Sequence, residues 1–479
     1  MQVTEVIIFI VYFTILIGIA VVTSRKQKSN TDFLMGNRSL NFWLTALSAH
    51  ASDMSSWLFL AYPALIFTGG LFNVWAAVGL TSFMYLNWQF IAPKIRTITE
   101  QTNSLTLSAY FENRVADKSG SIRIISAIAN LLFYTIYISS GLIGLGLLVD
   151  SLFGIDYIFG ISLGLFIVML YVFLGGYKTV AWIDLFQGFF LLGVIIFIPA
   201  FLLTKIGGMK PIFDVAKAHN ISFSLFPDFK PLTLLKIIFL ACGWGLGYFG
   251  QPHIITKFMG IRKVSEIRYS KYLGISWQIL ALTGASLVGL IGIYYFPTGL
   301  ANPELLILKI VQAFLLPLFG GLVLCAILAA TTNVMAAQIL VVASSLAEDF
   351  YKKLINREAP GTELLWVSRF SVILISIVSY IIALLKISTI YELVLYAWSG
   401  LGSSFGPLLL ISLYSTKINR YGALTGIIVG GVVGASWPYF NRFLSIQVPA
   451  MFPGFILSAC SIYLVSYLTR NKIPVEVES

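Results

Sequence analysis

The sequence predicts an all-α membrane protein. Three observations support this class: the 479 residues are 58% hydrophobic and 11% charged, the mean hydropathy is +0.89, and long apolar runs follow one another along the chain. A soluble domain carries about 25% charged residues. A chain of this length would form about three soluble domains, and this composition cannot supply their polar surfaces. Lipid is therefore the predicted solvent, and disordered, collagen-like, disulfide-rich and soluble nucleic-acid-binding chains are excluded.

The first apolar run, residues 6–22, has no Lys or Arg before it and is followed by Arg25, Lys26 and Lys28. A signal peptide carries its positive charge in front of the apolar run, so we expect a retained span with the N-terminus outside. Twelve further spans bring the expected total to thirteen; they lie near 42–69, 71–92, 122–149, 156–175, 180–204, 232–257, 272–296, 312–346, 366–385, 390–414, 421–440 and 450–469.

The basic residues support this order of spans. From an outside start, the loops that begin near residues 24, 93, 176, 258, 347, 415 and 470 lie in the cytoplasm. With the adjoining helix ends they hold 23 of the 31 Lys and Arg residues, which is the cytoplasmic excess typical of membrane proteins. The C-terminus is therefore expected inside, and the net charge of +11 needs no nucleic-acid partner.

Three features between the spans carry further expectations. Residues 104–112 should form a short interfacial helix. The longest outer segment, 206–231, contains three prolines, and both a lid and a passive connector agree with its composition. Glu348 and Asp349 are expected at the cytoplasmic mouth, either as groups that attract cations or as solvated charges at a helix end.

Two expected spans are interrupted near the middle of the membrane. The second span contains four serines and the ionisable Asp53 between Leu47 and Trp57, and the seventh contains four glycines and Pro252 between Gly243 and His253. Backbone groups in hydrocarbon must be paired, and an Asp at the centre of an isolated helix costs about 2.5–3.5 kcal/mol. Both segments should therefore face protein or a water-filled cavity.

Counted from the second span, the interrupted spans are the first and the sixth of ten. This spacing predicts two inverted five-helix repeats with a binding site between the breaks, where helix N-termini attract anions and unwound carbonyl groups coordinate a cation. Packing seams of small residues are the alternative. The predicted organisation is an extra helix and loop (1–41), a first repeat (42–205), an external loop (206–231), a second repeat (232–415) and two C-terminal helices with a tail (416–479).

Other chemistry is not indicated by the sequence. Residues 245–250 match the glycine pattern of dinucleotide-binding loops, but they lie inside an apolar span without a preceding strand. Of the three scattered histidines, His50 and His253 lie near the breaks. A membrane enzyme needs catalytic groups clustered at one interface, and a channel needs a continuous polar stripe. Neither pattern is present, so we expect no catalytic residues and no cofactor.

The segments described so far resemble the sodium/solute symporter family, and within it the bacterial sodium/proline symporters. The resemblance runs from the first span to about residue 470. The matching pieces are Ser52 to Ser55 with Trp57 and Pro63; Leu105 to Leu107 with Tyr110 and Phe111; Thr135 to Tyr137; Trp182, Asp184 and Gln187; Trp244 to Ile254; Ala326 to Ala330; Glu348 and Asp349; and Ala397 and Trp398 with Phe405 to Pro407.

The resemblance implies a leucine-transporter-type fold, with one helix before the ten-helix core and two after it, and a substrate site between the breaks. The positions that match the family's substrate site are Ser55, Ser56, Trp57, Tyr137, Trp244, Tyr248 and Pro252. Proline is a zwitterion with an apolar ring, so backbone amides suit its carboxylate, and the faces of Trp244 and Tyr248 suit its ring and ammonium group. Simple core packing is the alternative for these two residues.

The implied sodium site consists of the carbonyl groups of Ala51, Met54 and Ala330 together with two hydroxyl groups. This chain has Asn333 and Val334 at the hydroxyl positions. Asn333 still offers an oxygen and Val334 offers none, so the site should be weaker unless water completes it. The neighbouring threonines, 331 and 332, point elsewhere around the helix.

Asp53 and Asp184 are acids deep in the expected spans, and we place both on the ion path. Asp184 matches an acid that the family has there; for it, a structural hydrogen bond, ion passage and proton uptake all remain open. Ser56 stands where the proline branch usually has glycine. This difference predicts a narrower cavity or a changed choice of amino acid.

The predicted function is sodium-coupled import of L-proline, or of a similar small amino acid, by alternating access across the cell inner membrane. Sodium is then a co-substrate. Because of Asn333 and Val334, one alternative is a transporter of the same fold that has lost sodium dependence and works by proton coupling, exchange or facilitated diffusion. Another is a different small organic solute. The expected partners are the solute and the lipid bilayer, and the sequence indicates no obligate protein partner.

Overall fold

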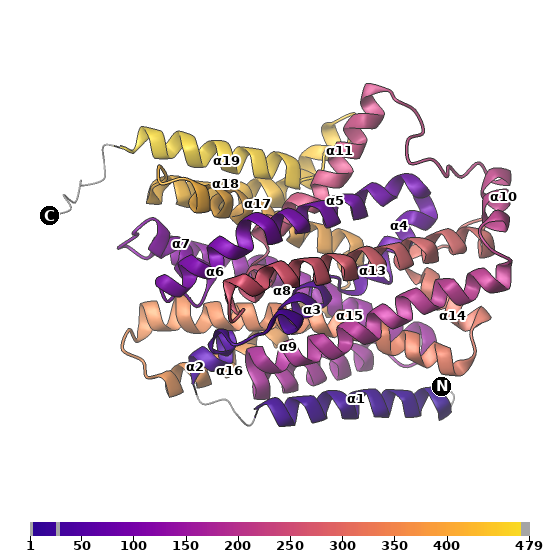
Figure 1. Cartoon of the computed structure of the whole chain (residues 1–479), viewed down its shortest axis with the longest axis horizontal. Coiled ribbons are helices and arrows are strands. Elements are labelled where there is room, and N and C mark those ends of the chain that lie inside the picture. The colour runs from indigo at the N-terminus through magenta and orange to yellow at the C-terminus, as the bar shows by residue number, and fades with distance from the viewer. Residues whose placement is uncertain (1–2, 25–28, 471–479) are drawn as a thin grey trace.

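The computed structural model describes residues 3–24 and 29–470. Within these ranges the regular structure is helical, apart from one backbone bridge between Leu40 and Ile261. The long helices run side by side along one direction (Figure 1). Among the described residues ten helices are long and apolar enough to cross a membrane, one of them, α11, only together with the 3-10 turn that continues it to Gly250: α1 (Val3–Ser24), α8 (Ser121–Phe153), α9 (Tyr157–Ile206), α11 (Pro231–Gly245), α13 (Ile267–Tyr295), α15 (Pro317–Ser344), α16 (Gly361–Leu384), α17 (Ile390–Tyr414), α18 (Arg420–Phe440) and α19 (Met451–Leu468). The all-α class is confirmed.

The remaining expected spans have less regular counterparts. Helix α9 has 50 residues, and Gly176, with φ of 52°, divides it into two lengths that correspond to the expected spans 156–175 and 180–204. A side chain at Gly176 would overlap the ring and carbonyl group of Phe33, so this position requires glycine. Between residues 71 and 101, α5 (Val74–Leu86) continues through a π turn (Asn87–Ile91) into α6 (Ala92–Gln101). The expected span 42–69 is a broken pair, α3 (Phe42–Ala51) and α4 (Ala61–Gly69). The total of thirteen spans stays a prediction.

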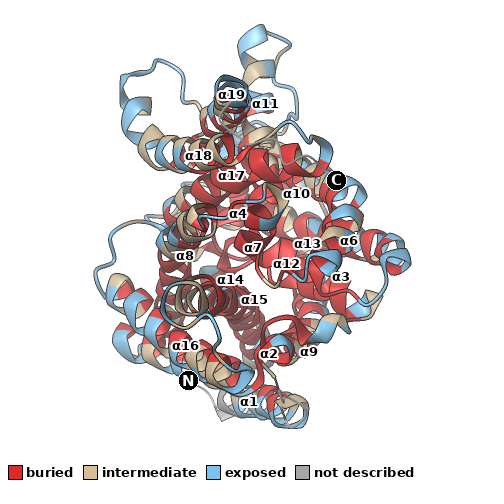
Figure 2. Cartoon of the chain, turned by 90° about the vertical axis from the view of Figure 1, so that its left-hand side faces the viewer, coloured by how far each residue is buried: buried red, intermediate tan, exposed pale blue. Residues whose placement is uncertain are grey.

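The bundle is organised around α15, in which residues 323–344 are all buried. Buried residues fill the middle of the bundle, and exposed residues lie at its periphery (Figure 2). The peripheral helices expose large apolar side chains, among them Ile10 on α1, Leu374 on α16 and Leu464 on α19. A wide apolar exterior of this kind fits a lipid environment. The polar groups of interest are instead buried between the helices.

The expected short helix near 104–112 is present as α7 (Leu107–Arg114). Thr106 caps it, because its Oγ1 accepts a hydrogen bond from the backbone N–H of Ala109 at 3.0 Å. Residues 107–112 are buried against neighbouring helices, and the interfacial position of this helix stays a prediction. The other short helices are α2 (Asn30–Met35), α10 (Lys210–Ala218), α12 (Pro252–Met259) and α14 (Leu306–Phe314).

Candidate functional site

The first predicted break is confirmed between α3 and α4. Helix α3 ends at Ala51, and a 3-10 turn, Ser56–Leu58, precedes α4. Between them Ser55 has φ of 42° and ψ of −170°, a backbone conformation that residues other than glycine rarely adopt. The Ser55 hydroxyl accepts a hydrogen bond from the N–H of Trp57 at 3.1 Å. The last carbonyl groups of α3 therefore lie at an open helix end within the bundle.

The second predicted break is confirmed between α11 and α12. A 3-10 turn, Leu246–Gly250, follows α11, Gln251 is extended, and α12 starts at Pro252. Gly247 allows the chain to pass directly over Trp398 of α17, because a Cβ there would overlap the indole. Gln251 Nε2 donates to the Trp398 carbonyl group at 3.1 Å, which fixes the turn against α17.

The two breaks contact each other through Asp53 and Tyr248. The Tyr248 hydroxyl donates a hydrogen bond to Asp53 Oδ2. Gln278 of α13 donates to the Tyr248 hydroxyl at 3.1 Å, and Asn87 of the π turn donates to the Tyr248 carbonyl group at 2.9 Å. The buried carboxyl group of Asp53 is thus held by the opposite broken helix, which is supported by two further elements.

A small cavity lies at this contact, and the centre of a water molecule can move within about 20 Å³ of it. It is lined by Asp53, Met54, Trp57, Leu80, Tyr137, Trp244, Tyr248, Val394 and Trp398. The structure therefore brings together four of the residues predicted for the substrate site: Trp57, Tyr137, Trp244 and Tyr248. A volume of this size holds about one water molecule, so an amino acid needs side chains to move apart.

The other residues predicted for the substrate site lie outside the lining. Ser56 faces α8, where a Cβ on Gly144 would lie 3.1 Å from its Oγ. Pro252 is the first residue of α12 and sets the start of that helix. Ser55 lies in the break itself and bonds the backbone.

Sequence reasoning missed Leu80, Val394 and Trp398 as lining residues. Trp398 belongs to an aromatic cluster: the rings of Trp57 and Trp244 are 4.9 Å apart, and those of Tyr248 and Trp398 are 5.2 Å apart. Its indole N–H donates to the carbonyl group of Trp244 at 2.8 Å. A tryptophan in the glycine- and serine-rich middle of α17 was the available signal.

The residues predicted for the cation site, Ala51, Met54, Ala330 and Asn333, are all buried. The Met54 carbonyl group accepts a hydrogen bond from the N–H of Leu58 at 3.1 Å. Asn333 is the unusual member, because neither its Oδ1 nor its Nδ2 has a hydrogen-bond partner among the described residues. Buried amide groups are normally paired, so an unpaired one indicates room for a ligand or water.

The two threonines beside Asn333 are occupied elsewhere. The Thr331 hydroxyl donates to the carbonyl group of Ile327 at 2.8 Å, and that of Thr332 donates to Leu328 at 2.8 Å. Both bonds are internal to α15. Val334 is buried as well and offers no oxygen.

Asp184, which we placed on the ion path, is paired with a lysine that sequence reasoning missed. Lys257 Nζ lies 3.1 Å from Asp184 Oδ2, and the Ser48 hydroxyl donates to the same oxygen at 2.5 Å. Lys257 is in α12, Ser48 is in α3 and Asp184 is in α9, so this cluster joins both broken helices to α9. No signal in the sequence indicated this pairing, because Lys257 stands at the end of an expected span beside a cytoplasmic loop rich in basic residues.

The two histidines near the breaks are held by aromatic residues. Trp88 donates its indole N–H to His50 Nε2 at 3.0 Å, and the Tyr134 hydroxyl lies 2.9 Å from His253 Nδ1. Both rings are fully buried, and neither lines the cavity. Their observed contacts are those of structural hydrogen bonds.

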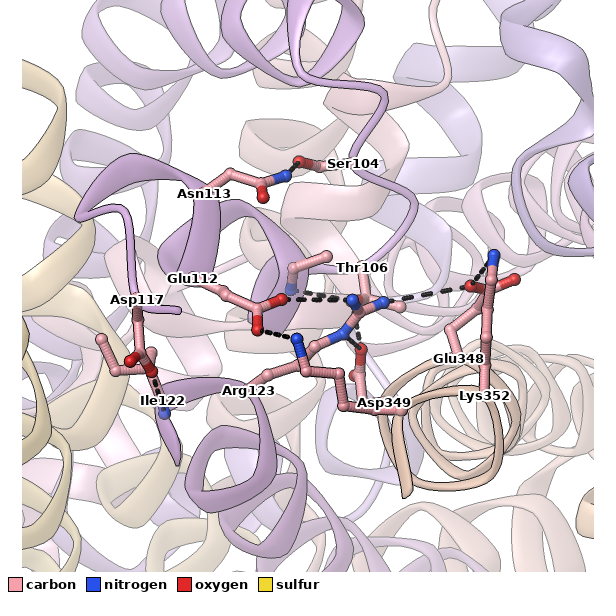
Figure 3. A network of polar contacts seen from close by, with 12 residues as sticks. Ser104, Thr106, Glu112, Asn113, Asp117, Ile122, Arg123, Glu348, Asp349 and Lys352 are labelled. Atoms are coloured by element: carbon pink, nitrogen blue, oxygen red, sulfur yellow. Dashed lines mark hydrogen bonds and ion pairs between the residues drawn. The ribbon is translucent and has the colours of Figure 1, made fainter. Parts of the chain in front are cut away.

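A second polar cluster surrounds Arg123 of α8 (Figure 3). Arg123 lies 2.7 Å from Asp349, 3.2 Å from Glu112 and 3.9 Å from Glu348. Glu348 and Asp349 are 3% and 0% exposed, so the interpretation as solvated helix-end charges is wrong. They are instead paired with basic side chains of the protein, because α7 and α8 cover the π-helical segment, Ser345–Ile355, that carries them.

Comparison with known proteins gives the family. A model of the sodium:solute symporter family matches residues 33–430. A high-affinity proline transporter of Bacillus subtilis is 40% identical over 93% of this chain and 94% of its own length. An osmoregulated proline transporter of the same organism is 37% identical over 96% and 94%. A sodium/proline symporter of Staphylococcus aureus is 38% identical over 97% and 93%.

Solved structures give the fold. A Na⁺-coupled sialic acid symporter in a substrate-bound, outward-open state has a TM-score of 0.83 at 18% identity, covering 98% of both chains. A transporter of the nucleobase-cation-symport-1 family has a TM-score of 0.59 at 15% identity, covering 94% of this chain and 97% of that one. The fold is therefore of the expected leucine-transporter type. With a family model over most of its length and relatives about 40% identical along nearly all of it, the chain belongs to the sodium:solute symporter family.

Proposed function

We propose that this protein imports L-proline, or a similar small amino acid, together with sodium by alternating access. The observation that carries the proposal is the contact between the two broken helices, where Tyr248 holds Asp53 at a cavity lined by aromatic residues. The relatives named for proline transport in Bacillus subtilis and Staphylococcus aureus support the solute. The family supports coupling to sodium.

The proposed substrate residues are those predicted from the sequence: Ser55, Ser56, Trp57, Tyr137, Trp244, Tyr248 and Pro252. The strongest support is for the four that line the cavity, to which we add Trp398. The positive end of the helical segment after the first break suits the carboxylate of an amino acid, and the indole faces suit its ring and ammonium group. The cavity must widen to admit the solute, and the non-helical segments supply the positions at which the half-helices turn.

The proposed sodium ligands are the carbonyl groups of Ala51, Met54 and Ala330 and the side-chain oxygen of Asn333. The unpaired, buried amide of Asn333 supports this assignment. Val334 supplies no ligand, so we expect weaker binding than in a site with two hydroxyl groups. Asp53 and Asp184 are proposed to guide the cation, since both are buried acids near the breaks.

The proposed arrangement in the membrane has thirteen spans, with the N-terminus outside and the C-terminus in the cytoplasm. Its core consists of two inverted five-helix repeats, 42–205 and 232–415. The distribution of Lys and Arg supports the orientation, and the matched positions of the breaks support the repeats. The proposed location is the cell inner membrane; the bacterial relatives, which are named as transporters, support a cell membrane in general.

Uptake of labelled proline into proteoliposomes tests the proposal. We expect uptake that is driven by an inward sodium gradient and collapses when that gradient is removed. Absence of uptake in every condition would refute the solute. Equal uptake with and without sodium would support the alternative that Asn333 and Val334 favour, a transporter of this fold without sodium dependence.

A further inference from the structure

Lys257 and Asp184 form an ion pair in the core of the protein. Their side chains are 2% and 1% exposed, and Lys257 Nζ lies 3.1 Å from Asp184 Oδ2. The same oxygen accepts the hydrogen bond from Ser48, while Asp184 Oδ1 has no hydrogen-bond partner among the described residues. Lys257 Nζ also lies 5.2 Å from the ring centre of Tyr177. One lysine therefore neutralises a carboxylate that the surroundings satisfy only in part.

The pair lies next to the proposed sodium site. Gln187, one turn after Asp184 on α9, donates to Thr332 Oγ1 at 3.3 Å, beside Asn333. One residue further along α9, a Cβ on Gly188 would lie 3.2 Å from the Cβ of Ala51. The face of α9 that carries Asp184 thus contacts both helices, α3 and α15, that supply the proposed ligands. Gln187 Oε1 also has no partner within the described residues, so unpaired oxygens line this side of the site.

A carboxylate at this depth requires a positive charge. Burying an isolated charge is costly, and the available counter-charges are a lysine or arginine, a dissolved cation or a proton. In this chain Lys257 supplies the charge from α12. A dissolved cation at the neighbouring site then meets a neutral pair rather than a free acid.

We propose that Lys257 is the fixed counter-ion of Asp184, which removes the need for a second dissolved cation and leaves one sodium ion carried with each substrate molecule. The proposal rests on the proposed function, because it concerns the number of coupled cations. It assigns Lys257 as a positioning residue that acts through Asp184. Substrate contact is not part of its role.

Lys257→Gln tests the proposal, because it leaves Asp184 without its counter-charge. Wild-type uptake should depend on sodium with a Hill coefficient of about one, and the variant should show about two or should acquire a proton requirement. That requirement appears as uptake that falls when the external pH is raised from about 6 to about 8 at fixed sodium. Lys257→Arg keeps the charge and should behave as the wild type.

Two further variants separate charge from structure. Lys257→Gln combined with Asp184→Asn removes both charges. Because Asp184 is itself proposed to guide the cation, the rate of uptake should fall, while the Hill coefficient of the remaining uptake should return to about one with a flat pH profile. Lys178→Gln is the matched control: Lys178 lies on the same helix as Asp184, α9, and forms a partly exposed ion pair with Asp32 of α2. This variant should change neither readout. The other titratable groups that interact with the pair are Tyr171, Tyr177 and His253; all three remain in every variant.

The outcomes are distinct. A Lys257→Gln variant that transports with the sodium order and pH profile of the wild type overturns the inference. If that variant does not reach the membrane, the double variant decides: a sodium order of about one, read from its remaining uptake or from the sodium dependence of its melting temperature, supports the inference, and an order of about two overturns it. A wild-type chain without sodium-stimulated uptake refutes the proposed function itself.

Discussion

The hydroxyl group of Tyr248 donates a hydrogen bond to Oδ2 of Asp53, 195 residues earlier in the sequence, and so connects the two broken helices. Each break leaves helix ends inside the bundle, and this contact lies where they meet. The same tyrosine is held by Gln278 and Asn87, so its position does not depend on Asp53 alone. Asp53 therefore receives a donor that is already in place.

Removing this hydroxyl group should impair transport without unfolding the protein. In Tyr248→Phe the ring still fills its site, but the Asp53 carboxyl group loses its donor. A hydrogen bond to a charged group contributes about 1.5–3 kcal/mol, so kcat/KM for proline should fall by about 10- to 100-fold. Tyr157→Phe is the matched control, because its buried hydroxyl bonds the carbonyl group of Ala383, away from the cavity. Equal uptake by wild type and Tyr248→Phe would show that the contact has no part in transport.

Replacing Asn333 and Val334 by Ser and Thr should strengthen sodium binding. The double variant supplies two hydroxyl oxygens at positions where the chain now offers one amide and one methyl-bearing side chain. The sodium concentration for half-maximal uptake should fall by about tenfold, since one additional ligand at 1.4 kcal/mol has that effect. Thr331→Val is the control, because its hydroxyl bonds only the backbone of its own helix. An unchanged sodium dependence would place the cation site elsewhere.

The breaks were predictable from the sequence because their signals are local. Glycines and a proline in one apolar span, and serines with Asp53 in another, are incompatible with a regular helix in lipid. The contact of Tyr248 with Asp53 was not predictable, since it depends on how distant segments pack. The π turn after Leu86 likewise leaves no mark in hydropathy.

The buried acids show the same contrast between what a local sequence signal predicts and what depends on packing. Asp184 was singled out by its depth, whereas Lys257 lies at the edge of an expected cytoplasmic loop, where the usual excess of basic residues accounts for it. Its direction into the core follows only from the turn at Gln251. Glu348 and Asp349 were assigned to solvent or to cations because nothing in the sequence places Arg123 beside them.

A methyl group at Gly247 should disrupt the second break. In Gly247→Ala the new Cβ overlaps the Trp398 indole, so either the turn or the tryptophan must move. We expect loss of uptake and a lower melting temperature in detergent, because overpacking costs about 1–3 kcal/mol. Gly193→Ala, on α9, is the control, since its Cβ would meet no atom within 4 Å. A Gly247→Ala protein with wild-type uptake would contradict the requirement for close packing here.

Glu304 should make stability depend on pH at the segment that precedes α14. Burial raises the pKa of Glu304 above its usual range, although its Oε1 accepts a hydrogen bond from the N–H of Tyr391 at 3.0 Å. Because the folded-state pKa is the higher one, the stabilisation is complete below the usual pKa and is lost as the pH rises through the raised value. Glu304→Gln keeps an acceptor and cannot ionise, so the melting temperature of this variant should change less with pH than that of the wild type between about pH 4 and 7. Glu358→Gln, at an exposed site, should retain the wild-type slope; the same slope in Glu304→Gln would contradict the assignment.

Arg123→Ala should destabilise the protein strongly, because it leaves Glu112, Glu348 and Asp349 with less positive charge in a buried cluster. The Arg123 side chain is 17% exposed, and those of its partners are 8%, 4% and 0% exposed. Removing one partner of a buried pair costs about 3–5 kcal/mol. Arg262→Ala breaks a pair with Glu266 in which the arginine is 53% exposed, and it should cost less than about 1 kcal/mol. Thermal unfolding of both variants in detergent measures the difference. Equal melting temperatures would mean that Lys353, 2.6 Å from Glu112, and Lys352, 3.2 Å from Glu348, already neutralise the cluster without Arg123.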